Sequence, residues 1–263
     1  MAKNRKGICH LCGSYKKLSF EHLPPKKAFN DCPVKHYNYF MGITEGNYNN
    51  QTSQKGLGGY TLCEGCNNKT GSWYGTAFIK WACQSMNILE YTQNQPSLYY
   101  RFRIFPVRVI KQIACMMFSV NTDEFRQYHQ ELVKFVLNRE EYYLNPDIKF
   151  FAFYNAAGFR MSGGMVKVKT NNFNMDSLEG IGESVDRIRT KIETHCALSE
   201  LSFPPLGYVL TFDSELPDPR LVDISYFAKY RYDDLCSIEL RLPVLPIDSP
   251  YPTDYRSRQE IEY

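Results

Sequence analysis

The sequence predicts an α+β protein in two parts: a small domain held together by metal, residues 1–82, and a larger α+β domain, residues 83–263, in which helices precede a mostly antiparallel sheet. Three observations predict this organisation. Two Cys-x-x-Cys pairs lie in the first part, apolar residues recur at helical spacing through the middle of the chain, and β-rich runs follow residue 146. A chain of 263 residues can bury a substantial core.

Composition indicates a soluble globular protein, with 22% charged and 15% aromatic residues and too little Pro and Gly for extended disorder. The N-terminus leads into a Cys-x-x-Cys and not into an apolar run of signal-peptide length. The most apolar window, residues 107–120, is too short for a membrane span and contains Arg108, Lys111 and Gln112. We therefore expect a cytoplasmic protein without membrane contact, in which cysteines at suitable spacing bind metal and do not form disulfides.

Positive charge is concentrated near the N-terminus. Residues 1–80 contain 11 Lys and Arg against 4 Asp and Glu, whereas the remainder contains 20 against 24. This asymmetry is expected if a polyanion approaches the first part, although a solvated basic surface would give the same count.

Helical periodicity begins directly after the second cysteine pair. The stretch "WYGTAFIKWACQSMNIL", residues 73–89, repeats apolar side chains at three- and four-residue spacing, which predicts a helix that starts at the metal site and enters the second domain. Two further helices are predicted, over residues 106–120 after an opening Pro106 and over residues 122–138 after a Thr122 or Asp123 cap.

Strand-like composition follows. Residues 148–170 contain two β-rich runs around a glycine-containing connection, which is typical of a hairpin. Further strands are expected over residues 206–212, 222–231 and 236–245, and a short polar helix over residues 180–195.

The first two cysteine pairs have the spacing of a metal site. Cys9 and Cys12 in "CHLC" and Cys63 and Cys66 in "CEGC" form two turns that can each aim two sulfurs at one ion, completing the tetrahedral thiolate set that zinc prefers. Four thiolates leave no open coordination position, so we expect structural zinc. A redox dithiol is the alternative for either pair, but no thioredoxin-like pattern surrounds them.

Between the pairs stands "LSFEHLPPKKAF", residues 18–29, and the last cysteine is followed at once by Asn67. A Glu-His pair at the end of a strand, between Cys-x-x-Cys upstream and Cys-x-x-Cys-Asn downstream, resembles the HNH, or ββα-metal, endonucleases of the zinc-knuckle, endonuclease VII type. The resemblance covers residues 8 to 82. It implies a zinc-stabilised β-hairpin and helix carrying a metal-dependent nuclease site, and HNH domains with unfamiliar partner domains often act in bacterial antiviral defence or restriction.

The resemblance assigns His22 as the general base and Glu21 and Asn67 as ligands of a catalytic Mg or Mn ion. Phosphodiester hydrolysis needs a water deprotonated near neutral pH and a dication to take up charge on the phosphate, and imidazole and hard oxygen ligands suit these tasks. Adjacent strand residues point to opposite faces, so Glu21 and His22 converge only if the strand bends or ends at this point. Asn68 is the alternative amide ligand, and the middle Asn of the family pattern has no clear match.

Lysines near this motif are expected to contact the DNA backbone; they are Lys16, Lys17, Lys26 and Lys27. Phosphate contacts carry no sequence information, and no base-recognition helix is evident, so we expect weak sequence specificity. Residues 83–263 match no motif and could serve regulation, substrate positioning or oligomerisation, through a regulatory partner or a second copy. The competing hypothesis is a non-catalytic zinc-ribbon module that binds nucleic acid or protein.

Overall fold

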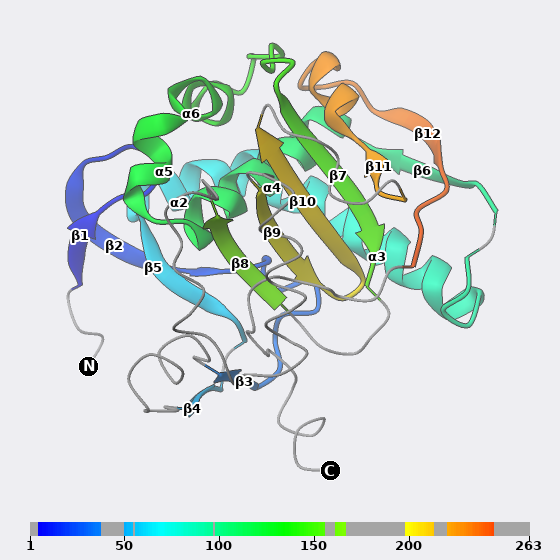
Figure 1. Cartoon of the computed structure of the whole chain (residues 1–263), viewed down its shortest axis with the longest axis horizontal. Helices are drawn as coiled ribbons and strands as arrows, with labels where there is room; N and C mark the ends of the chain where they lie inside the picture. Colours follow the sequence, from blue (N-terminus) through cyan, green and yellow to red (C-terminus); the bar gives the residue numbers. More distant parts are fainter. Residues whose placement is uncertain are drawn as a thin grey trace, which may run out of the picture.

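The computed structural model describes residues 5–37, 50–54, 56–96, 98–155, 161–166, 198–212 and 220–244. Within these ranges the fold is mixed α and β with antiparallel sheets, which confirms the α+β class (Figure 1). Every helix among the described residues is too short or too polar to cross a membrane.

The N-terminal part is a three-stranded sheet followed by a long helical segment. β1 (Lys6–Ile8), β2 (Tyr15–His22) and β5 (Gly58–Cys63) pair antiparallel in the order β1-β2-β5. Helix α2 (Glu64–Thr70) starts directly after β5 and continues through a π-helical turn, η1 (Gly71–Gly75), into α3 (Thr76–Tyr91). A separate pair, β3 (Val34–Tyr37) and β4 (Asn50–Ser53), lies between β2 and β5 in sequence.

Helix α4 (Pro106–Val120) is buried along nearly its whole length, and 13 of its 15 residues are solvent-inaccessible. A helix that is apolar on every side must be covered on every side. Residues of α4 contact α3, η1, α6 (Gln130–Leu137), β9 (Leu198–Phe203) and the 3-10 turn η3 (Ser225–Lys229). The short helix α5 (Asp123–Tyr128) connects α4 to α6.

The C-terminal part provides a five-stranded antiparallel sheet in the order β11-β7-β10-β9-β8. Its remaining strands are β7 (Ile148–Tyr154), β8 (Met161–Val166), β10 (Leu206–Phe212) and β11 (Val222–Asp223). A two-stranded ribbon, β6 (Tyr100–Ile104) with β12 (Cys236–Leu240), lies beside α3.

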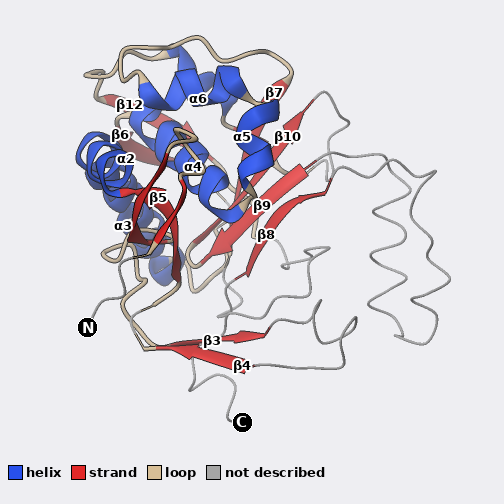
Figure 2. Ribbon diagram, turned by 90° about the vertical axis from the view of Figure 1, so that its left-hand side faces the viewer, coloured by secondary structure: helices blue, strands red, loops and turns tan. Residues whose placement is uncertain are grey.

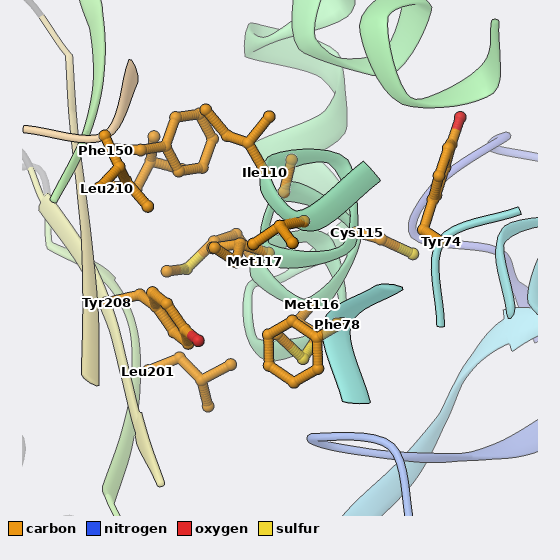
Figure 3. Close-up of a cluster of buried hydrophobic side chains, with 14 of the residues drawn as sticks. Tyr74, Phe78, Ile110, Cys115, Met116, Met117, Phe150, Leu201, Tyr208 and Leu210 are labelled. Carbon is orange, nitrogen blue, oxygen red and sulfur yellow. The ribbon is translucent and has the colours of Figure 1, made fainter. Parts of the chain in front are cut away.

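Helix α4 lies between the N-terminal hairpin and the five-stranded sheet (Figure 2). Phe150, Leu210 and Tyr208 approach it from the sheet, and Tyr74 approaches it from the opposite side (Figure 3). The ring of Phe78 lies beside that of Tyr208, with the two centroids 6.0 Å apart. One continuous cluster of buried apolar side chains extends from the first cysteine pair to residue 242. The boundary expected after residue 82 falls inside α3, which contributes to this cluster.

The structure confirms the helices expected over residues 73–89 and 106–120, and it divides the third helix into α5 and α6. The hairpin expected over residues 148–170 is wrong, because β7 and β8 are not neighbours in the sheet. Six of the seven residues of β7 are buried, so it is an inner strand, paired with β10 and β11. The predicted helix over residues 180–195 lies outside the described residues.

The long strand expected over residues 222–231 is also wrong. Only Val222 and Asp223 pair, and the chain then turns into η3. Ile224, Phe227 and Ala228 are all buried, a helical spacing that places them together against the core. Strand β6, by contrast, was not expected from the sequence.

A hydrogen bond joins α3 to the sheet: the Trp81 indole Nε1–H donates to the Tyr208 hydroxyl at 2.8 Å, and both side chains are buried. We predict that Tyr208→Phe lowers the free energy of unfolding by about 1–3 kcal/mol, because the indole N–H is left buried without its acceptor. Tyr91→Phe, at a side chain 85% exposed on the same helix, is the control and should change nothing measurable in urea unfolding. Equal stabilities of the two variants would contradict the prediction.

Candidate functional site

Four cysteines from the two pairs meet in one cluster. The Sγ atoms of Cys9, Cys12, Cys63 and Cys66 all lie within 4.8 Å of one another, and those of Cys12 and Cys63 are 3.9 Å apart. A regular tetrahedron with metal–sulfur distances of about 2.3 Å places its sulfurs about 3.8 Å apart. The cluster could therefore hold a structural metal ion such as zinc.

Local backbone geometry prepares the cluster. The turn after Cys9 closes with hydrogen bonds from the Gly13 N–H to the Cys9 carbonyl and from the Cys9 N–H to the Ser14 carbonyl. Gly13 has φ of +73°, and a Cβ there would lie 2.6 Å from the Arg126 guanidinium carbon, so this position requires glycine. The second pair lies where β5 becomes α2, with Cys63 preceding the first helical residue.

One sulfur of the cluster, that of Cys9, already favours negative charge. A hydrogen bond from the Cys66 thiol, together with bonds from the backbone, lowers the pKa of Cys9 to about 4, and the same contact raises the pKa of Cys66. The backbone N–H of Cys63 donates to the Cys9 sulfur at 3.3 Å. A bound dication would allow the remaining thiols to lose their protons, because metal ligation requires thiolates.

The pairing of the adjoining strand β2 with β5 is irregular before β2 ends. Ser19 pairs with Leu62 and Glu21 with Gly59, so Tyr60 and Thr61 of β5 together oppose Phe20 and form a β-bulge. Beyond the bulge, His22 is half-buried and its ring meets that of Phe20 edge-on, with centroids 5.0 Å apart. Desolvation, and to a lesser degree the charge of Lys26, lower the pKa of His22. The imidazole is therefore neutral at neutral pH and can accept a proton.

One nitrogen of this imidazole lacks a partner. His22 Nδ1 is buried and makes no hydrogen bond with any of the described residues. A buried polar atom without a partner costs about 1–3 kcal/mol, so such atoms are expected where a ligand or a water completes the site.

Glu21 points the other way, into the protein, and is 5% exposed. Its Oε2 accepts hydrogen bonds from Thr61 Oγ1 at 3.3 Å and from Ser119 Oγ of α4. Desolvation raises the pKa of Glu21 to about 7 despite these two donors. Within the described residues no hydrogen bond reaches its other oxygen, Oε1.

Asn67 fastens the helix to the strand. Its Nδ2 donates to Ser19 Oγ at 3.0 Å and to the Phe20 carbonyl at 3.3 Å, and no described hydrogen bond uses its Oδ1. Asn68 is exposed and makes no described side-chain contact with β2. Asn67 therefore meets β2 at the residue directly before Glu21 and His22. No described hydrogen bond joins two of these three side chains to each other.

A further amide, not expected from the sequence, fixes the loop after His22. Asn30 is fully buried; its Nδ2 donates to the carbonyls of Pro24 and Leu57, and its Oδ1 accepts from the Leu57 N–H, each at 2.7 Å. Gly56, with φ of +87°, lies so close to the Asn30 carbonyl that a Cβ would be 2.2 Å away. The loop is thereby held against the start of β5.

Sequence reasoning also missed Thr61 and Ser119, the donors to Glu21. Thr61 could have been found from the register of the hairpin, but Ser119 lies 98 residues away on a helix with no motif. The expected lysines Lys16, Lys17, Lys26 and Lys27 are all exposed. The sequence offers Asn47, Asn49 and Asn50 for the middle Asn; the first two lie outside the described residues, and Asn50 is the first residue of β4.

Comparison with known proteins gives no family. No family model matches the chain, and no match was found among curated proteins or among solved structures.

The cluster predicts a metal-dependent fold. We expect Cys66→Ser to reduce bound zinc from about one ion per chain to almost none and to lower the thermal unfolding midpoint, because three thiolates do not complete the tetrahedral set. Metal content by mass spectrometry and a thermal melt measure this. Cys236→Ser, at a partly buried cysteine outside the cluster, is the control. Equal metal content in both variants would show that the cluster holds no zinc.

Glu21 predicts a pH-dependent stability. Its pKa is raised from 4.5 to about 7, so its favourable contribution is present below pH 4.5 and is lost as the pH rises through 7. The difference corresponds to on the order of 3 kcal/mol. Glu21→Gln, which keeps an acceptor for Thr61 and Ser119, should therefore raise the free energy of unfolding at about pH 8.5 more than at about pH 6.

Urea unfolding of zinc-loaded protein without magnesium measures this effect. The control is Glu239→Gln, at an exposed acidic residue of β12, which should show no such pH dependence. A Glu21→Gln variant that loses stability equally at both pH values would show that the carboxylate is ionised and well stabilised.

Proposed function

We propose that the chain is a metal-dependent endonuclease of the HNH type that hydrolyses phosphodiester bonds in DNA. The observation that carries the proposal is the contact of Asn67, the residue after the last cysteine, with the Phe20 carbonyl, the residue before Glu21 and His22. This contact holds the Asn67 amide against the backbone of β2 directly before Glu21, which points into the protein, and His22, which points to the opposite face. A zinc ribbon that only binds needs the cysteines and the basic residues but has no use for this set.

His22 is the proposed general base. Its lowered pKa keeps the imidazole neutral near pH 7, and its buried Nδ1 has no described partner, so this nitrogen is able to accept a proton from an attacking water. Lys26, which helps to lower the pKa of His22, also supplies positive charge for a phosphate. Asn30 holds the loop that carries Pro24 and Lys26 in place.

Glu21 and Asn67 are the proposed ligands of a catalytic Mg or Mn ion. The donor set fits: Oε1 of Glu21 and Oδ1 of Asn67 are hard oxygens that no described hydrogen bond uses, and the buried carboxylate has a raised pKa that a cation would lower. When bound, the ion would stabilise negative charge on the phosphate and the leaving oxygen. The hydrogen bond from Asn67 Nδ2 to Ser19 orients the amide ligand, and those from the Thr61 and Ser119 hydroxyls to Glu21 orient the carboxylate.

The larger part of the chain contributes to the proposed site, because Ser119 of α4 donates a hydrogen bond to the Glu21 carboxylate. We propose that it positions or controls the nuclease, and that antiviral defence or restriction is its setting. Exposed lysines around β2 would bind the DNA backbone and give little sequence specificity.

A non-catalytic zinc module remains the second candidate. It is favoured by the Oε2 atom of Glu21, which is already bonded to Thr61 and Ser119. The two candidates differ in whether the protein cleaves nucleic acid.

A cleavage assay tests the proposal. With Mg or Mn, the unaltered protein should cut plasmid, linear or branched DNA, with RNA as a further substrate, and His22→Ala should lower the rate by about 10²–10⁴-fold while zinc content and melting midpoint stay unchanged. Added imidazole should restore part of the activity if His22 acts as a base.

Cleavage that persists in His22→Ala would remove this residue from the mechanism. No cleavage of any substrate by the unaltered protein would favour the binding module. Tyr91→Ala, at an exposed side chain on α3, is the control for unspecific effects.

A further inference from the structure

A row of side chains crosses one face of the three-stranded sheet and ends at His22. The Arg5 guanidinium lies 4.4 Å from the centroid of the Tyr60 ring, Tyr60 and Phe20 are 5.5 Å apart, and Phe20 and His22 are 5.0 Å apart. The ring planes meet at 71° and 85°, so no two of the three rings are stacked face to face. This stacking row, as we call Arg5, Tyr60, Phe20 and His22, lies on the face opposite to Glu21, which accepts hydrogen bonds from Thr61 and from Ser119 of α4.

Two members of the row, Arg5 and Phe20, are exposed, and Tyr60 and His22 are half-buried. Phe20 is 36% exposed, and its ring lies over Gly58 of the neighbouring strand. A Cβ at Gly58 would lie 2.1 Å from the Glu21 carbonyl and 2.8 Å from the Phe20 ring. The close approach of the two strands therefore depends on this glycine. The bulge of β5 opposite Phe20 and the glycine opposite His22 together leave room for the Phe20 ring beside the proposed base.

The charge around the row is positive. Arg5 of the row and Lys16, which shares the Phe20 face of β2 by strand alternation, are exposed, and the exposed cross-strand pair Lys6 and Lys17 lies on the other face. Strands β1, β2 and β5 contain one acidic residue, Glu21, and its carboxylate is buried on the face opposite to the row. An aromatic strip bordered by cations, with no exposed acid on its strands, is complementary to nucleic acid: cations bind phosphates and rings stack on bases.

We infer that the stacking row binds an unpaired nucleotide of the DNA strand that is cut, with its base on Phe20. The inference rests on the proposed function and names its substrate class. Bases within a duplex are already stacked on both faces, so a protein ring can stack only on an unpaired or extruded base. The ring centroids of His22 and Phe20 are 5.0 Å apart, which is less than the length of one nucleotide. A nucleotide whose base stacks on Phe20 therefore brings its phosphodiester within reach of His22. Single-stranded, flapped or branched DNA is therefore the substrate class.

Binding without Mg or Mn tests the inference. Fluorescence anisotropy compares a labelled oligothymidine with a blunt duplex of the same length. Phe20→Leu should weaken binding of the single strand by about 5- to 150-fold, and binding of the duplex by less than about twofold. Phe20→Tyr should retain the binding, which separates loss of the ring from loss of folding. Tyr15→Leu, at a side chain 70% exposed at the other end of β2, is the matched control and should change neither.

Cleavage by the unaltered protein is measured in parallel on single-stranded, branched and duplex DNA. Two results would overturn the inference and leave the nuclease proposal standing. One is cleavage at the same rate with Phe20→Leu as with the unaltered protein. The other is an equal loss of single-strand binding in Phe20→Leu and Tyr15→Leu. Ring-dependent binding of the single strand without cleavage of any substrate would support the stacking row and remove the nuclease proposal.

Discussion

The burial of α4 is the constraint on which the rest of the structure depends. A helix of 15 residues with 13 buried cannot face water on any side, so the sheet, α3, α6 and the N-terminal hairpin all pack around it. Its polar side chains must then find partners inside: Lys111 donates to the carbonyls of Asn138 and Arg139, and Ser119 donates to Glu21. The proposed site is therefore partly built from the core.

The cysteine cluster complements this packing at the N-terminus. It joins the turn after β1 to the junction of β5 and α2, two points that the short strands could not hold together by burial alone. The same junction fixes the first turn of α2, so Asn67 is positioned by the cysteine that precedes it. His10, between the first two cysteines, also connects this turn to α4, because its Nδ1 lies 3.3 Å from the Phe118 carbonyl oxygen.

The helices over residues 73–89 and 106–120 and the cysteine cluster followed from spacing in the sequence, whereas the position of Asn67 beside β2 was expected from the family resemblance. Periodicity identifies a helix from local residues alone, and a Cys-x-x-Cys pair encodes its own geometry. The order of strands did not follow: β7 looked like half of a hairpin, yet its partners are β10 and β11, which lie much later in the chain. The orientation of Glu21 was equally hidden, since it depends on the bulge of β5 opposite Phe20 and on Ser119, both set by tertiary packing.

Because one apolar cluster extends from Cys9 to Leu242, the N-terminal part has no separate hydrophobic core. Cutting the chain within α3 would expose Tyr74, Phe78 and Trp81 on one side and much of α4 on the other. The N-terminal part is therefore not an independent domain that recombination could transfer intact to an unrelated protein. Changes in its inner face must be matched by changes in α4, so the two parts are expected to evolve as one unit.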